Sequence, residues 1–155
     1  MQLQFEQVIA LPRDTVWAFH ENPTHLVLHQ DWSRFRLLAH AGNVQTGNQT
    51  WFETTVAGIL PVVLGFEHTT YEPPRCFAEQ LVHGPFRTFT HRHEFEETNN
   101  GTRVRDVLTV ELPWYYGGEP MMKTVVGPLL RYAFRQRGAA LAKQAQSGQI
   151  APGRK

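Results

Sequence analysis

Residues 84–106 read GPFRTFTHRHEFEETNNGTRVRD, and this stretch decides the fold. Two runs of alternating side chains flank Asn99-Asn100-Gly101, which is a typical hairpin turn. We therefore predict two long antiparallel strands, over residues 87–97 and 103–112. Because successive strand residues point to opposite faces, one face of the first strand carries both apolar and imidazole side chains, namely Phe89, His91, His93 and Phe95. Such a mixed face is expected where a sheet lines a cavity.

Five further segments before this hairpin alternate in the same way and are separated by short turns. They predict strands over residues 2–10, 35–40, 49–56, 62–71 and 76–82. Pro12 and Asp14 favour the start of a helix after the first strand. Thr24 can cap a second short helix that extends to Leu28. We therefore expect two short helices between the first and second strands.

A helical pattern replaces the alternation over residues 119–146, and Gly127-Pro128 is expected to kink or restart this helix. Its apolar side chains follow one broad arc: Met122, Val125, Val126, Leu129, Leu130, Ala133, Phe134 and Leu141. A long helix after an antiparallel sheet must bury this arc, and the economical solution lays it across the concave face of a curved sheet. We predict an α+β domain over residues 1–146, with about seven strands wrapped around the helix, and a polar tail over residues 147–155.

The bulk composition excludes several classes of protein. The chain has 155 residues, a formal net charge of +1 and a single cysteine, Cys76. Its basic residues are scattered, whereas nucleic-acid binding usually needs a concentrated basic stripe. One cysteine cannot form an internal disulfide, and no apolar run approaches the length of a transmembrane helix. No nucleotide-binding loop, serine-hydrolase motif or paired-cysteine metal motif occurs. We expect a cytoplasmic protein with no membrane span, no nucleic-acid partner and no cofactor.

Several motifs occur together in one order. They are Phe5 to Phe19 with Pro12, Asp14 and Trp17; Glu72-Pro73-Pro74 with Phe77; Gly84-Pro85-Phe86; His91-x-His93-x-Phe95; Gly101-Thr102 with Asp106; and Phe134-Arg135-Gln136-Arg137. In this order the chain resembles the START-like, or SRPBCC, superfamily, over nearly its whole length. Within it, the chain is similar to an uncharacterised ligand-binding branch related to polyketide cyclase/dehydrase proteins, some of which carry a cell-division-inhibitor label. The resemblance implies the helix-grip fold. Gln136 stands where that branch commonly has histidine, which weakens any catalytic role there.

Polar residues converge on the inner face of the predicted hairpin. His91 and His93 point to one face, and Asp106 lies across the hairpin on the inward side. Because an unpaired buried polar group costs about 1–3 kcal/mol, we predict that Asp106 hydrogen-bonds one of these histidines. The cluster can be a structural network, an anchor for a ligand headgroup, an acid/base pair or a two-histidine, one-carboxylate metal site. Alternation also places His68 and Glu79 inward. We expect no bound metal, because the sequence offers no convincing third protein ligand beyond Asp106.

We predict an enclosed pocket of roughly a few hundred Å³ between the sheet and the helix. The candidate ligand-binding residues are His68, Glu79, Phe89, His91, His93, Asp106, Val110, Val126, Leu130 and Phe134. Arg137 interrupts the apolar arc of the helix. Its side chain either extends to solvent, which its long stem favours, or meets a carboxylate such as Asp106 or Glu79.

Three hypotheses about function follow. The first is the binding of a hydrophobic small molecule, such as a lipid, a polyketide or an aromatic compound, in this pocket. The second is a polyketide cyclase or dehydrase that uses His91 or His93, with Asp106, for acid/base catalysis. The third is a protein-interaction role linked to cell division, which rests on analogy alone. The sequence specifies neither the ligand, nor whether a reaction is catalysed, nor the oligomeric state.

Overall fold

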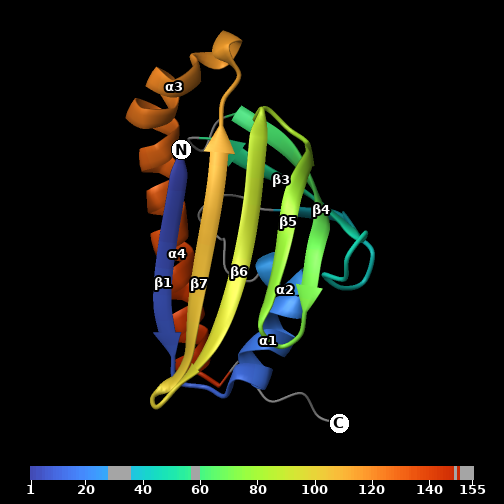
Figure 1. Cartoon of the computed structure of the whole chain (residues 1–155), viewed down its shortest axis with the longest axis vertical. Coiled ribbons are helices and arrows are strands. Elements are labelled where there is room, and N and C mark those ends of the chain that lie inside the picture. The colour runs from blue at the N-terminus through green and yellow to red at the C-terminus, as the bar shows by residue number, and fades with distance from the viewer. Residues whose placement is uncertain (28–35, 57–59, 149, 151–155) are drawn as a thin grey trace.

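Strands in antiparallel pairs form one seven-stranded sheet, as predicted (Figure 1). The computed structural model describes residues 1–27, 36–56, 60–148 and 150. Along the sheet the order is β1-β7-β6-β5-β4-β3-β2, so chain neighbours pair throughout except that β1 pairs with β7. The bounds are Gln2–Ile9 (β1), Arg36–His40 (β2), Gln49–Val56 (β3), Leu60–Glu72 (β4), Cys76–His83 (β5), Thr88–Thr98 (β6) and Gly101–Glu111 (β7). Position 35 of the predicted strand 35–40 lies outside the described residues.

The β6–β7 hairpin has the register that its turn predicts. Thr98 pairs with Gly101, so that Asn99 and Asn100 form the loop. Gly101 has a φ of +126°, and a Cβ there would lie 2.1 Å from the carbonyl oxygen of Ile9. Glycine is therefore required both by the backbone conformation and by the close approach of β1. Along β6, buried positions alternate with more exposed ones, which fixes the face that each side chain occupies.

The helices between β1 and β2 agree with the prediction only in part. One regular helix forms, α1 (Arg13–Glu21), and buries Val16, Trp17 and Phe19 against the sheet. The second predicted helix is a single turn, α2 (Thr24–Val27), and its predicted extension to Leu28 lies outside the described residues. Asn22-Pro23 ends α1 because proline forces the preceding residue out of the helical region; Asn22 has an extended ψ of 111°.

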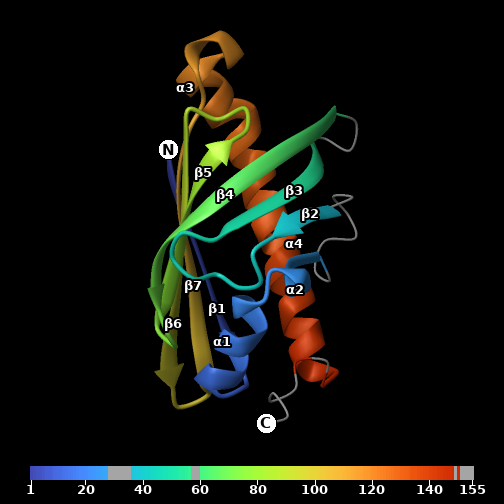
Figure 2. The ribbon, with the colours of Figure 1, turned by 90° about the vertical axis from the view of Figure 1, so that its right-hand side faces the viewer.

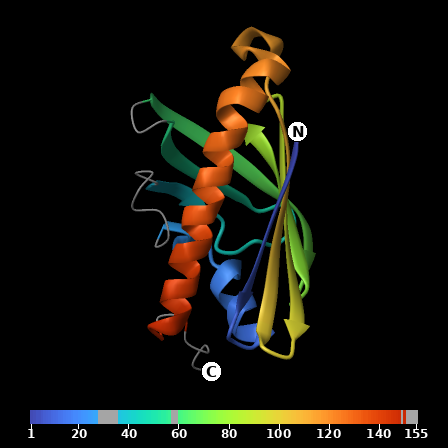
Figure 3. The same ribbon diagram turned by 90° about the vertical axis from the view of Figure 1, so that its left-hand side faces the viewer.

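In the described part of the chain, four helical segments, of the 3-10, α and π kinds, follow β7. They are a 3-10 turn (Trp114–Tyr116), α3 (Gly118–Met121), a π-helical turn (Met122–Val126) and α4 (Gly127–Gln146). The irregularity predicted at Gly127-Pro128 takes the form of this π turn, which fits a proline that has no N–H to donate to the preceding turn. Figures 2 and 3 show α4 running across the inner face of the bent sheet. The buried arc is narrower than predicted, since Val125 and Leu129 are 44% and 38% exposed.

Two hydrophobic clusters fill the space between the sheet and the helices. The α1 cluster contains Ile9, Val16, Trp17, Phe19, Val44, Phe77, Phe95, Val104, Leu141 and Ile150. The α3 cluster contains Leu3, Leu64, Phe66, Phe89, Leu108, Val110 and Met122, with Val126, Leu130 and Phe134 among the half-buried residues packed against it. Because Ile150 is buried in the α1 cluster, the segment predicted as a polar tail contributes at least this residue to the core.

Candidate functional site

Five polar side chains from four adjacent strands form a row on the inner face of the sheet. This polar row consists of His68 (β4), Glu79 (β5), His91 and His93 (β6) and Asp106 (β7). The strand register pairs His68 with Glu79 and Glu79 with His91. It also pairs His93 with Asp106. The side chains of the row are at most 13% exposed, so the inward orientation predicted from alternation is confirmed.

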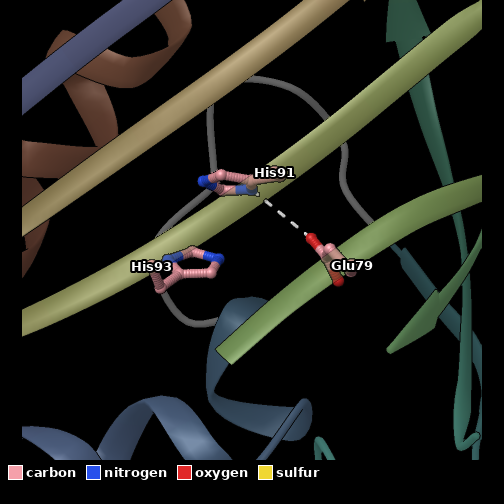
Figure 4. Close-up of side chains that lie close together, drawn as sticks. All are labelled: Glu79, His91 and His93. Carbon is pink, nitrogen blue, oxygen red and sulfur yellow. Dashed lines mark ion pairs between the residues drawn. The ribbon is translucent and has the colours of Figure 1, made fainter. Parts of the chain in front are cut away.

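His91 occupies the centre of the polar row and bridges its two carboxylates. Its Nε2 donates a hydrogen bond to Asp106 Oδ1 at 3.0 Å, which is the hydrogen bond predicted from the sequence. Its Nδ1 lies 3.4 Å from Glu79 Oε1, the ion pair drawn in Figure 4. His93 Nδ1 lies 2.7 Å from the same Asp106 oxygen, but without hydrogen-bond geometry. At the far end of the row, His68 Nδ1 lies 3.7 Å from Glu79 Oε2 and also has no hydrogen-bond partner among the described residues.

The polar row separates the two hydrophobic clusters. His93 stacks on Phe77 of the α1 cluster with ring centroids 4.3 Å apart. The rings of His91 and Phe134, on the side of the α3 cluster, lie nearly perpendicular with centroids 5.3 Å apart. Since buried polar groups are costly unless paired, a row of this kind through the middle of a core requires either mutual pairing or a ligand.

The environment of the polar row shifts the pKa values of its two central histidines in opposite directions and lowers those of both carboxylates. Burial opposes protonation of His91, but the hydrogen bonds and charges of Asp106 and Glu79 outweigh it and raise the pKa of His91. Burial and the neighbouring charge of His91 lower the pKa of His93 to about 3. Burial would raise the pKa of Glu79, but the hydrogen bond and charge of His91 lower it to about 2. The pKa of Asp106 is likewise held well below its ordinary value, against burial, by His93, Arg137 and His91. At neutral pH both carboxylates are therefore ionised and His93 is neutral, while His91 is the histidine of this group whose protonated form its neighbours favour.

A small cavity borders the polar row on the side of α1 and α4. Its volume is about 20 Å³, which is room for one water molecule. It is lined by Phe19, His20, Asn22, His25, Val44, His68, Phe77, Glu79, His93 and Arg137. A larger hollow of about 240 Å³ lies around the outward-facing side chains of β6, and is lined mainly by arginine and glutamate side chains such as Arg92 and Glu94 that pair with one another.

The predicted ligand-binding residues divide between this cavity and the core. His68, Glu79 and His93 line the cavity, while His91 and Asp106 lie directly behind them in the polar row. The apolar candidates Phe89, Val110, Val126, Leu130 and Phe134 belong to the α3 cluster or pack against it, and none of them lines the cavity.

The pocket beside the polar row is smaller than predicted, and its walls differ, because aromatic side chains fill the other half of the core. The rings of Phe134 and Phe5 stack with centroids 4.7 Å apart, and those of Phe89 and Phe66 lie nearly perpendicular with centroids 5.3 Å apart. Such packed pairs occupy the space that the sequence assigned to a ligand. The cavity that remains therefore lies beside α1, where histidines line it together with Phe19 and Phe77.

Two further residues reach the cavity. His20 lies on α1 with its ring centroid 6.3 Å from that of His93, and burial with the charge of Arg137 lowers the pKa of His20 to about 4. His20 follows Val16 by four residues, so the helical period itself indicates that both share the buried face. Arg137 lines the cavity from α4, half-buried, with its guanidinium over the ring of Phe134. The structure shows neither full extension to solvent nor an ion pair with Asp106 or Glu79, because the half-buried side chain lines the cavity beside the polar row.

Among the residues that the structure describes, no helix has the length and apolar character needed to cross a membrane.

Comparisons with known proteins agree on family and fold. Residues 9–142 match the profile of a family described as polyketide cyclase / dehydrase and lipid transport. No curated protein matches the chain. Among solved structures, the chain is similar to protein TTHA0849 from Thermus thermophilus, with a TM-score of 0.76 and 16% identity over 96% of this chain and 99% of that one.

Two more solved structures have the same fold. One is protein Ms6760 from Mycobacterium smegmatis, with a TM-score of 0.72 and 16% identity over 94% of this chain and 91% of that one. The other is an AHSA1-like protein from Aeromonas hydrophila, with a TM-score of 0.68 and 11% identity over 100% of this chain and 99% of that one. At these identities the likeness concerns the fold alone.

Proposed function

Because the chain belongs to the polyketide cyclase / dehydrase and lipid transport family, we propose that it binds a small hydrophobic molecule between the sheet and α4. This family falls within the START-like, or SRPBCC, superfamily that the sequence motifs resemble, and membership implies a hydrophobic ligand. Residues 1–146 form the ligand-binding domain. A lipid, a polyketide or an aromatic compound with one polar end fits this site best, since the polar row offers charged and neutral hydrogen-bonding groups at one place in an apolar interior.

The observation that carries this proposal is the incomplete packing of α4. Of its 20 residues only Gly127 and Leu141 are fully buried. Leu130 and Phe134 pack against the α3 cluster, yet both are only half-buried. A ligand inserted under this part of α4 would bury apolar surface that the helix leaves partly exposed. Such burial contributes a favourable free energy of about 25 cal/mol per Å². Since the cavity holds about 20 Å³ and ligand sites roughly 300–1,000 Å³, binding requires side chains of α4 to move aside.

The proposal is tested with an environment-sensitive probe, 1-anilinonaphthalene-8-sulfonate, and with native mass spectrometry of the purified protein. We expect saturable probe binding that increases fluorescence, and displacement of the probe by long-chain fatty acids. Leu130→Trp places a bulky indole ring between α4 and the sheet, where the ligand would insert, and is expected to weaken probe binding at least about tenfold, a change of roughly 1.4 kcal/mol.

A matched control introduces the same residue on the outer side of the same helix. Tyr132 is 54% exposed, so Tyr132→Trp is expected to bind the probe like the natural protein. Circular dichroism melts establish that both variants are folded. If the natural protein does not bind the probe in its folded state, or if Leu130→Trp binds as tightly as Tyr132→Trp, the site under α4 is rejected.

A cyclase- or dehydrase-type reaction is the second candidate function, favoured by the two central histidines. Their ring centroids are 3.8 Å apart, and their pKa values move in opposite directions: that of His91 is raised and that of His93 is lowered to about 3. A neutral imidazole next to an imidazolium can accept a proton while its neighbour donates one. Turnover of a poly-β-ketone substrate that is lost in His93→Gln, with probe binding retained, supports catalysis. Equal turnover in the variant excludes His93 as the base.

A further inference from the structure

The polar row has the donor set of a metal site. Glu79, His91 and His93 each present one nitrogen or oxygen atom, and these three atoms lie within 4.8 Å of one another. Figure 4 shows all three side chains turned toward a common point between β5 and β6. We propose that Glu79, His91 and His93 bind one divalent transition-metal ion of the Zn²⁺ class. Two imidazoles and one carboxylate are a usual donor set for such ions.

The spacing of the donors suits a small ion. In a tetrahedral zinc site the metal–ligand bonds are about 2.0–2.2 Å, which separates neighbouring donor atoms by roughly 3.4 Å. The distance of 3.4 Å between His91 Nδ1 and Glu79 Oε1 already has this value. Since all three donors lie within 4.8 Å of one another, the remaining donor has to approach by at most about 1.4 Å, and metal binding requires a shift of the His93 or Glu79 side chain of that size.

Asp106 supplies the outer support that metal-binding histidines usually have. Its Oδ1 accepts the hydrogen bond from His91 Nε2 and lies 2.7 Å from His93 Nδ1. A histidine that binds a metal commonly directs its second ring nitrogen at a carboxylate, which fixes the tautomer and the ring orientation. One carboxylate oxygen holds His91 by a hydrogen bond and lies next to one nitrogen of His93, so that a second nitrogen of each ring remains for the ion.

Charge and unused polar groups favour the same interpretation. Glu79 and Asp106 bring two carboxylates into the interior, with side chains only 13% and 12% exposed. A divalent cation between them balances that charge. His68 Nδ1, in a side chain 2% exposed, has no hydrogen-bond partner in the part of the chain that the structure describes and lies 3.7 Å from Glu79 Oε2. The adjoining cavity of about 20 Å³ has room for a water molecule in the fourth position.

The sequence alone argued against a metal, because it offered no convincing third protein ligand beyond Asp106. The strand register changes this argument by placing Glu79 directly opposite His91. Metal binding is independent of the proposed hydrophobic ligand, since it needs no movement of α4. The two proposals can therefore fail separately.

The full-length chain, stripped with a chelator and dialysed, is titrated with Co²⁺ and with Zn²⁺. Bound Co²⁺ absorbs visible light in a way that depends on its direct ligands, so its spectrum reports coordination rather than folding. We expect one ion per chain, a Co²⁺ spectrum of low coordination number and its loss when Zn²⁺ is added. Glu79→Gln and His93→Gln keep the side-chain size and are expected to weaken binding at least 100-fold, while Asp106→Asn weakens it about 10–100-fold.

His83→Gln is the matched control, since His83 lies on the same strand as Glu79 but is exposed. It is expected to bind like the natural protein. Circular dichroism confirms that each variant is folded, and if His93→Gln does not fold, Glu79→Gln alone decides. Absence of stoichiometric binding by the natural protein, or equal affinity in Glu79→Gln, refutes the metal site and leaves the polar row as a metal-free network.

Discussion

The clearest prediction from the polar row is that acid destabilises the metal-free protein well before ordinary carboxylates titrate. His20 and His93 are neutral in the folded chain, with pKa values lowered by burial from 6.5 to about 4 and about 3. In the unfolded chain both recover ordinary values. Between about pH 6.5 and about pH 4 the unfolded state therefore binds more protons than the folded state, so the free energy of unfolding falls as the pH falls.

The expected magnitude follows from these pKa values. Moving from about pH 7 to about pH 5 costs on the order of 2 kcal/mol for each of the two histidines. His91 acts in the opposite direction, because a raised folded-state pKa contributes stability that is fully present at low pH and is lost as the pH rises through that pKa. Glu79 adds a loss only at lower pH, between its ordinary value and about 2. The net expected loss is therefore smaller than the sum for His20 and His93, which is on the order of 4 kcal/mol.

Urea unfolding followed by tryptophan fluorescence measures this loss, with a chelator present throughout. Trp17 lies in the α1 cluster, so its emission reports the core. His20→Gln can still donate to the Val16 carbonyl, which His20 Nδ1 contacts at 2.8 Å, and it is expected to remove the His20 share of the pH-dependent loss, on the order of 2 kcal/mol. His83→Gln, at an exposed position, is expected to leave it unchanged. A free energy of unfolding that stays constant or rises on acidification, or a full pH dependence in His20→Gln, refutes the reasoning.

Three further outcomes are expected. Asp106→Asn leaves His91 paired with Glu79 alone and is expected to lower the free energy of unfolding by about 3 kcal/mol. If the polar row only supports the fold, the folded variant still binds ligand; if the row anchors a ligand, the folded variant loses binding. Gly101→Ala places a Cβ 2.1 Å from the Ile9 carbonyl and is expected to destabilise by more than about 1 kcal/mol, which a thermal melt close to that of the natural protein would contradict. Leu141→Ala removes a fully buried side chain and is expected to cost about 2–5 kcal/mol, whereas Leu129→Ala, partly exposed on the same helix, costs much less; equal losses in urea unfolding would show that α4 docks differently.

The sequence by itself determined the sheet and the composition of its inner face. Alternation and the Asn-Asn-Gly turn are local signals, and a two-residue loop leaves the two long strands a single register. His91, His93 and Asp106 were therefore predicted inward and in contact before any tertiary contact was known. The long C-terminal helix and its irregularity near Pro128 also follow from local preferences, because a proline alters the hydrogen bonding of its own turn wherever the helix docks.

The tertiary structure alone decided how the space under the helix is used. The 3.4 Å approach of Glu79 to His91 depends on the register between β5 and β6, two strands whose turn has no comparable hairpin signal. The size of the cavity depends on the rotation of α4, which lets Phe134 stack on Phe5 and directs Arg137 toward the polar row. A periodic pattern specifies which side of a helix is buried but not which side chains meet across an interface. Contacts of that kind depend on how side chains from distant segments fill the interior together, because protein interiors are packed as densely as organic crystals.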